Sequence, residues 1–82
     1  MTERSLMPAY RFTVTIDSDV PHEPVFRHLR DADAAWDEAG RLARETWAAS
    51  GDRRLMQAVV VVTDAAGEIV LEFPFTEALT AP

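Results

Sequence analysis

Apolar and polar side chains alternate at the start of the chain, at Tyr10, Phe12, Val14 and Ile16. Alternation with period two, in a segment rich in β-branched residues, is typical of a strand with one buried face. It predicts a first strand over about residues 9–17. Residues 18–24 contain Pro21 and Pro24 and predict a loop, and residues 25–29 predict a short second strand.

The spacing becomes helical after Arg30. One set of side chains recurs every three or four positions: Ala32, Ala35, Trp36, Ala39, Leu42, Ala43, Thr46 and Trp47. This spacing places them on one face of a helix over about residues 32–49. Asp31 or Asp33 is the predicted N-cap, and Gly51 is the predicted left-handed stop. Gly40 inside the helix costs roughly 1 kcal/mol relative to alanine. Either a neighbour packs close to Gly40, or Gly40 lies on the polar side.

The opposite face of this helix is charged and consists of Asp33, Asp37, Glu38, Arg41, Arg44 and Glu45. Asp37 and Glu45 each lie four residues from Arg41, a spacing that supports ion pairs of roughly 0.2–0.5 kcal/mol. A solvated helix face and an N-cap explain the neighbouring acids more simply than acid–base catalysis does.

Residues 59–75 predict a β-hairpin, with strands over about residues 56–64 and 68–74. Asp64-Ala65-Ala66-Gly67 fits a type I turn followed by glycine in a G1 bulge, which pairs Asp64 with Glu68. Counting back from that pair places Val61 opposite Leu71 and Val59 opposite Phe73, on the side expected to face the helix. The other side then carries Val60, Val62, Val70 and Glu72. A short helical turn is expected over residues 76–79.

Both faces of the predicted hairpin are therefore apolar, while one helix covers only one face of a small sheet. Burying each outer valine would contribute roughly 1.5–3 kcal/mol. A symmetric dimer, packed sheet on sheet or through strand edges, would cover them; the alternative is that they are ordinary exposed strand residues. Proline donates no backbone hydrogen bond and marks an edge or an end of its strand. The candidate interface residues are Val60, Val62, Val70, Glu72 and Pro74.

Length and composition narrow the class of protein. The 82 residues make one domain at most: a flexible leader over 1–7, then a single α+β domain over 8–80. The expected fold is ββαββ, a four-stranded, mainly antiparallel sheet with one long helix on one face. The net charge of −6 opposes binding to nucleic acid. No run resembles a signal peptide or a membrane span, so a cytoplasmic location without membrane contact is expected.

Candidate chemistry is sparse. The chain has no cysteine, which excludes disulfides, thiolate metal sites and cysteine nucleophiles. His22 and His28 are weighed as metal ligands against a solvated loop, which is favoured because their spacing matches no known site. Trp36 and Trp47 are weighed as the lining of a ligand cleft against core residues, and the core is favoured. No serine has hydrolase context and no glycine-rich phosphate loop is present. We therefore expect no catalytic residue and no cofactor.

Several segments in order resemble a known family. They are Met7-Pro8-Ala9-Tyr10-Arg11-Phe12, the alanine-rich helix, Asp64-Ala65-Ala66-Gly67-Glu68-Ile69-Val70 and Phe73-Pro74-Phe75-Thr76-Glu77-Ala78. Together they resemble a family of small bacterial proteins of rhizobial and methylobacterial type, a domain of unknown function. The resemblance implies a strand–strand–helix–strand–strand domain and carries over no catalytic residue. The layout is also similar, in architecture only, to the small domain of HicB-type antitoxins.

Three functions follow as hypotheses. The first is a non-enzymatic interaction module that forms a homodimer through a sheet face or edge. The second is an antitoxin-like or regulatory partner of another protein, with the acidic helix face against a basic surface. The third is a small ligand-binding protein or enzyme that uses the tryptophans.

Overall fold

The computed structural model describes residues 7–17 and 19–80. The predicted leader therefore lies outside the described residues, apart from Met7. The elements are β1 (Ala9–Ile16), β2 (Val25–His28), α1 (Ala32–Ser50), the 3₁₀ helix η1 (Arg53–Gln57), β3 (Ala58–Thr63), β4 (Ile69–Pro74) and α2 (Phe75–Thr80). The predicted α+β class and ββαββ order are confirmed. The helical turn expected over residues 76–79 is part of α2, and η1 was not predicted.

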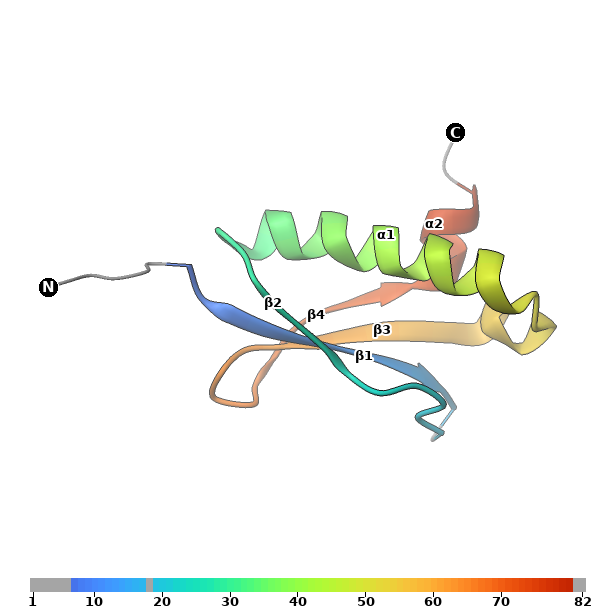
Figure 1. The fold of residues 1–82 in the computed structure, drawn as a ribbon, viewed down its shortest axis with the longest axis horizontal. Helices are drawn as coiled ribbons and strands as arrows, with labels where there is room; N and C mark the ends of the chain where they lie inside the picture. Colours follow the sequence, from blue (N-terminus) through green and yellow to red (C-terminus); the bar gives the residue numbers. More distant parts are fainter. Residues whose placement is uncertain (1–6, 18, 81–82) are drawn as a thin grey trace, which may run out of the picture.

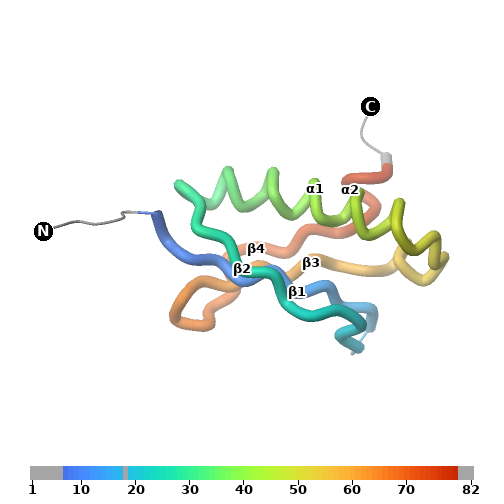
Figure 2. The backbone as a smooth tube through the Cα atoms, in the orientation of Figure 1, coloured from blue at the N-terminus to red at the C-terminus, as the bar shows by residue number. Residues whose placement is uncertain are grey.

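The four strands form one antiparallel sheet in the order β2-β1-β3-β4. After the β1–β2 hairpin, α1 carries the chain from edge strand β2 to β3, which pairs with β1. Both α1 and α2 lie on the same side of the sheet (Figures 1 and 2). One face of the sheet is thus covered by helices, and the other face has no helix against it among the described residues.

Local signals fix the ends of α1. The Asp31 side chain accepts a hydrogen bond from the Ala34 N–H at 2.9 Å, which identifies Asp31 as the N-cap. This backbone hydrogen bond is the main reason that the pKa of Asp31 lies below its ordinary value. At the other end, Gly51 has a φ of 67° and its N–H donates to the Trp47 carbonyl at 2.9 Å. Both caps use residues that the sequence marks for these roles.

Small side chains let α1 approach the sheet closely. Ala35, Ala39 and Ala43 are fully buried along the helix face. A Cβ atom added to Gly40 would lie 3.2 Å from Cζ of Phe73, tighter than most contacts of real Cβ atoms. The close-approach interpretation of Gly40 is therefore confirmed. The volume of the core comes from larger side chains below the helix, chiefly Phe12, Leu55, Phe73 and Phe75.

The hairpin turn forms as predicted. The Gly67 N–H donates to the Asp64 carbonyl, the Asp64 N–H donates to the Glu68 carbonyl, each at 2.9 Å, and Gly67 has a φ of 85°. The strand register beyond the turn differs from the prediction. Thr63 pairs with Ile69, but Val62 pairs with Leu71, so a bulge leaves Val70 as an extra residue in β4.

The bulge exchanges the two predicted faces of β3. Phe73 points into the core as expected, but it lies opposite Val60 and not Val59. Val60 and Val62 are 0% exposed beneath the helices, and Val70 packs against the core. Assigning these three valines to the uncovered face was therefore wrong, because the prediction assumed an unbroken period of two.

Candidate functional site

The uncovered side of the sheet, here called the outer face, is defined by the alternation of its strands. Tyr10, Phe12 and Ile16 of β1 and Ala58, Val60 and Val62 of β3 are buried on the helix side. Their neighbours along each strand, with their cross-strand partners, form the outer face: Ala9, Arg11, Thr13 and Thr15; Phe26 and His28; Val59, Val61 and Thr63; and Ile69, Glu72 and Pro74.

Two large apolar side chains stand out on the outer face. Phe26 on edge strand β2 is 63% exposed, and Ile69 on edge strand β4 is 61% exposed. Arg11 pairs with both Phe26 and Thr63, and Thr63 pairs with Ile69, so these side chains form one row across the whole sheet. Exposed apolar residues are common singly, but this row links two of them across four strands.

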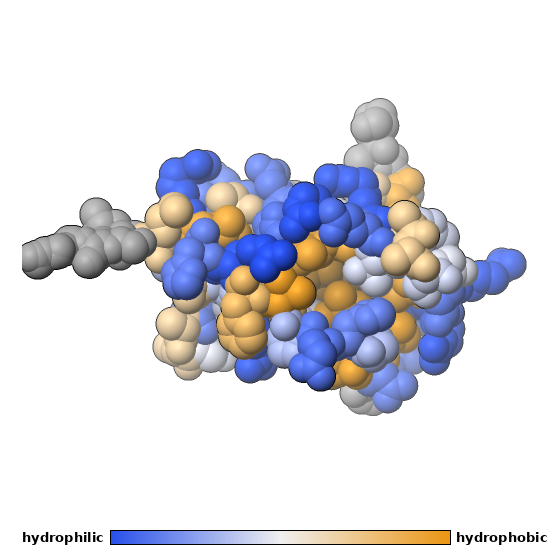
Figure 3. All heavy atoms as spheres, viewed as in Figure 1, coloured by the Kyte–Doolittle hydropathy of each residue, from blue (hydrophilic) through white to orange (hydrophobic). Residues whose placement is uncertain are grey.

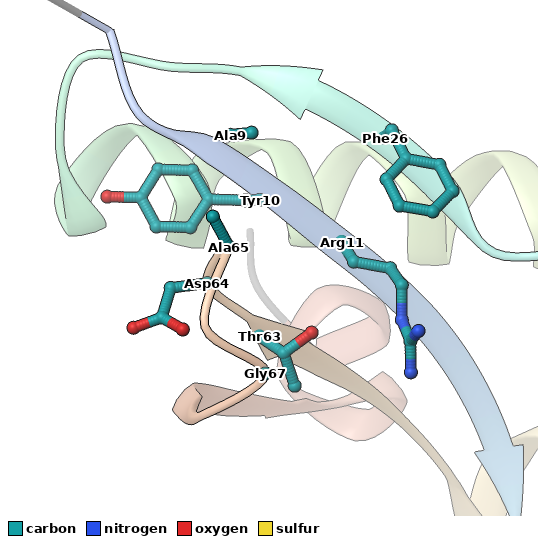
Figure 4. Close-up of a pocket in the computed structure, with 8 residues that line it drawn as sticks. All are labelled: Ala9, Tyr10, Arg11, Phe26, Thr63, Asp64, Ala65 and Gly67. Carbon is teal, nitrogen blue, oxygen red and sulfur yellow. The ribbon is translucent and has the colours of Figure 1, made fainter.

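A hollow of about 310 Å³ lies beside this row, between β1, β2 and the hairpin turn. Figure 4 shows Phe26 and Arg11 on one side of the hollow, with the turn residues Ala65 and Gly67 on the other. Most of its accessible lining is apolar. The hollow can therefore receive an apolar side chain next to a guanidinium group.

The centre of the outer face consists of small threonine and valine side chains. Thr13 lies opposite Val61, and Thr15 lies opposite Val59. The Thr15 hydroxyl donates to the Val59 carbonyl at 3.4 Å. Buried Oγ1 of Thr13 has no hydrogen-bond partner among the described residues. The two charged side chains of the face, Arg11 and Glu72, flank this centre on β1 and β4.

A second hollow, of about 350 Å³, lies between α1, β4 and α2, on the helix side of the molecule. Trp36 lines it and is 40% exposed. Its ring meets Phe73 edge to face, with the ring centroids 4.5 Å apart. Asp37, Arg44 and Glu77 add charged groups to the lining.

The family of this domain follows from comparison with known proteins. The family described as "Domain of unknown function (DUF6894)" matches residues 9–76. The chain belongs to the DUF6894 family. No curated protein and no solved structure matches the chain.

All of the outer face and most of the Trp36 hollow lie inside the DUF6894 match. Of the predicted interface residues, Glu72 and Pro74 lie on the outer face, opposite Val61 and Val59. Trp36 and Trp47 do not share a hollow: Trp47 packs partly buried against the core. Since their Cα atoms lie eleven residues apart on one helix, they are about 16 Å apart along its axis.

Three residues of the outer face of this DUF6894 domain, Phe26, Val61 and Ile69, were not predicted from the sequence as surface candidates. One signal was present. Ile69-Val70-Leu71 is a run of three apolar residues directly after the turn, and such a run breaks the alternation expected of a half-buried strand. A bulge is one cause of such a break, and here it leaves Val70 as the extra residue in β4.

The two histidines lie in separate places. His22 is in the loop beside the C-terminal half of α1, where it lines a hollow with Glu45 and Ser50, and His28 lies opposite Ala9 on the outer face. In the part of the chain that the structure describes, no three His, Asp or Glu side chains are grouped to hold a metal ion. None of the helices described there is long and apolar enough to cross a membrane.

Three charged side chains of α1, Glu38, Arg41 and Glu45, form ion pairs within the molecule. The Glu38 carboxylate accepts from Nε of Arg41 at 2.9 Å and from Nε of Arg27 on β2 at 3.2 Å, and Arg41 also pairs with Glu45. The hydrogen bond from Arg41 is the largest cause that lowers the pKa of Glu38. The Arg41–Glu45 pair was predicted, whereas Glu38 takes the place predicted for Asp37. Figure 3 shows hydrophilic side chains gathered over α1, with apolar atoms in the band between α1 and the strands below it.

Proposed function

We propose that this DUF6894 domain is a non-enzymatic interaction module that self-associates through the outer face of its sheet. The observation that carries the proposal is the row in which Phe26 and Ile69 are both more than 60% exposed. Val59 and Val61 continue the apolar surface beside this row. Phe26 and Ile69 lie at opposite edges of the outer face, with Arg11 and Thr63 between them, so the apolar surface is spread over the whole face. Exposed apolar surface gathered on one uncovered face favours an interaction site.

The side chains of the outer face suit contact. Threonine, valine and aromatic groups surround one arginine and one glutamate, so most of the surface can be removed from water without stranding a charge. Burying a side chain such as Phe26 or Ile69 contributes roughly 1.5–3 kcal/mol. A dimer would bury Phe26 and Ile69 of each chain. Their burial contributes several kcal/mol to the free energy of association, before the entropic cost of association is subtracted.

The size of the outer face fits a small, dissociable dimer. With strands about 4.8 Å apart and a rise of about 3.3 Å per residue, four strands of about six residues cover roughly 400 Å² before side-chain relief is counted. Side chains and flanking loops enlarge this area. A standard interface buries about 800 Å² per partner. The outer face therefore supports an interface smaller than the standard one.

Solution mass tests the proposal, measured by size exclusion with light scattering over a concentration series. The wild-type chain is expected to reach the mass of two chains at high concentration, and Ile69→Arg is expected to remain a single chain. Met56→Arg is the matched control: Met56 is 47% exposed but lies in η1, outside the outer face. A wild-type mass of one chain at every concentration would contradict the proposal.

A second candidate function is supported by the Trp36 hollow. A partly exposed indole beside Asp37, Arg44 and Glu77 offers a stacking surface and charged groups of both signs to a small aromatic ligand. We expect such a ligand to change tryptophan fluorescence saturably in the wild-type chain and not in Trp36→Phe, where Trp47 remains as the reporter. A saturable change that persists in Trp36→Phe would place the ligand elsewhere. The antitoxin-like alternative has less support, because two acids of the helix face, Glu38 and Glu45, pair with Arg27 and Arg41 of the same chain.

A further inference from the structure

We infer, on the basis of the proposed self-association, that a second copy docks on the outer face with Arg11 of each copy paired to Glu72 of the other. The outer face would then select its own copy by charge as well as by apolar contact. The inference rests on the charge of the face, on the state of these two side chains and on the symmetry of a dimer.

The outer face has no net formal charge, although the whole chain is negatively charged. Arg11 and Glu72 are the only guanidinium and the only carboxylate among its twelve side chains, and their formal charges cancel. The whole chain has a net charge of −6. Two copies repel one another at long range, but this face adds nothing to the repulsion. A strongly basic or acidic partner would gain no attraction from it.

Arg11 and Glu72 are both exposed, and neither forms an ion pair within residues 7–17 and 19–80. By contrast, Arg27, Arg30, Arg41 and Arg54 each pair with an acid of the same chain. Arg11 and Glu72 are separated by β3 and by one row, so strand geometry places their Cα atoms about 12 Å apart. Each is therefore available to an outside group of opposite charge.

Two-fold symmetry turns one such contact into two. In an isologous interface, if residue i of one copy contacts residue j of the other, then j also contacts i. Any two-fold axis that places Arg11 over the second copy's Glu72 thus places Glu72 over the second copy's Arg11. Two ion pairs then flank the threonine and valine centre and fix the relative orientation of the sheets. Charges arranged in this way determine specificity and register.

Charge reversal tests the pairing. The dimer dissociation constant is measured by sedimentation at pH 7.5 for wild type, Arg11→Glu, Glu72→Arg and the double variant Arg11→Glu/Glu72→Arg. Each single reversal places like charges opposite one another twice and is expected to weaken the dimer at least about tenfold. The double variant restores both pairs in reversed orientation and is expected to return to within about threefold of wild type.

Salt gives a second readout that a general loss of folding would not reproduce. Because salt screens exposed charges, raising it from 0.05 to 0.5 M, roughly, should strengthen the dimers of both single variants relative to the wild-type dimer. Arg53→Glu in η1 changes the net charge by the same amount as Arg11→Glu, but away from the face, and is expected to leave the dissociation constant much closer to that of wild type than Arg11→Glu does.

The outcomes separate the pairing from the self-association itself. If wild type dimerises, Ile69→Arg abolishes dimerisation and the reversals have no effect, then the outer face is the interface but the Arg11–Glu72 pairing is wrong. If both single reversals weaken the dimer and the double variant remains as weak, the pairing is also wrong. If wild type never dimerises, the self-association fails and the pairing fails with it.

Discussion

At the scale of single residues, Gly40 allows α1 to pack closely against Phe73 of the sheet. A Cβ atom there would meet Phe73 at 3.2 Å, while alanine gains roughly 1 kcal/mol of helix propensity over glycine. The two effects oppose each other, so we expect Gly40→Ala to change the free energy of unfolding by less than about 0.5 kcal/mol. Gly40→Val adds two further carbons against Phe73 and should lower it by about 1–3 kcal/mol. Urea unfolding measures both.

Ala48→Val is the matched control for Gly40→Val, because Ala48 is exposed on the same helix. It should lower the free energy of unfolding only through the lower helix propensity of a β-branched residue, by about 0.5 kcal/mol. If Gly40→Val were as stable as Ala48→Val, the contact with Phe73 would not limit the side chain at position 40.

Other single residues could be assigned from sequence because their roles depend on close neighbours. Asp31, Gly51 and Gly67 each satisfy or end a backbone hydrogen-bond pattern within four residues along the chain. Such roles follow from the chemistry of one side chain and the local backbone. The N-cap alternatives were separated only by the structure, because Asp31 and Asp33 both precede the apolar face.

At the scale of elements, periodicity predicted α1 well and the face of β3 poorly. Nineteen helical residues carry several turns of consistent spacing, and one irregular position does not alter their common face. A strand does not tolerate an irregular position in this way, because a shift of one residue exchanges its two faces. Val59–Val62 is apolar at every position, so it fits either face. The bulge at Val70 and the burial of Phe73 decide between them.

The candidate surface needed strand order as well as strand identity. Phe26, Arg11, Thr63 and Ile69 are distant in sequence and meet only because the sheet runs β2-β1-β3-β4. Local patterns predict which segments are strands, but not which strands are neighbours after a helical crossover. That choice depends on how the helix packs across the sheet, which is a tertiary property.

Also at the element scale, Glu38 of α1 forms an ion pair with Arg27 of β2, and this contact makes the stability of the fold depend on pH. Its side chain is 15% exposed between Arg27 and Arg41, and Arg41 chiefly lowers its pKa from the ordinary 4.5. Because the pKa of Glu38 is lower in the folded than in the unfolded chain, its ionised carboxylate stabilises the fold, and this stabilisation is complete above about pH 4.5. The stabilisation is lost as the pH falls through the folded pKa. We expect Glu38→Gln to lower the free energy of unfolding at pH 7 by about 1 kcal/mol.

The pH profile separates this effect from a general loss of packing. The difference between wild type and Glu38→Gln, followed by urea unfolding from pH 7 to pH 2, should shrink below pH 4.5. Glu45→Gln is the matched control: Glu45 pairs with Arg41 alone and its side chain is 62% exposed, so its substitution should have a smaller effect. A difference that stays constant down to pH 2 would contradict the role of the Glu38 charge.

At the scale of the whole molecule, helices cover only one face of the sheet in the part of the chain that the structure describes. The helices α1 and α2 cover the side that holds Val60, Val62 and Phe73. A chain of this size buries a modest share of its surface and gains little margin of stability from one core. Contact through the outer face would extend the buried surface without lengthening the chain. Stability and association should therefore be linked.

That linkage predicts a melting temperature that depends on concentration. A dimer that forms only from folded chains adds roughly 0.7 kcal/mol per chain for each tenfold rise in concentration above its dissociation constant. For a domain of about this size, 1 kcal/mol corresponds to about 4–8 °C, so the wild-type melting temperature should rise by about 3–5 °C per tenfold. Ile69→Arg should melt at one temperature throughout, while Met56→Arg should follow wild type. A wild-type melting temperature independent of concentration would mean that the outer face adds no stability through a second copy.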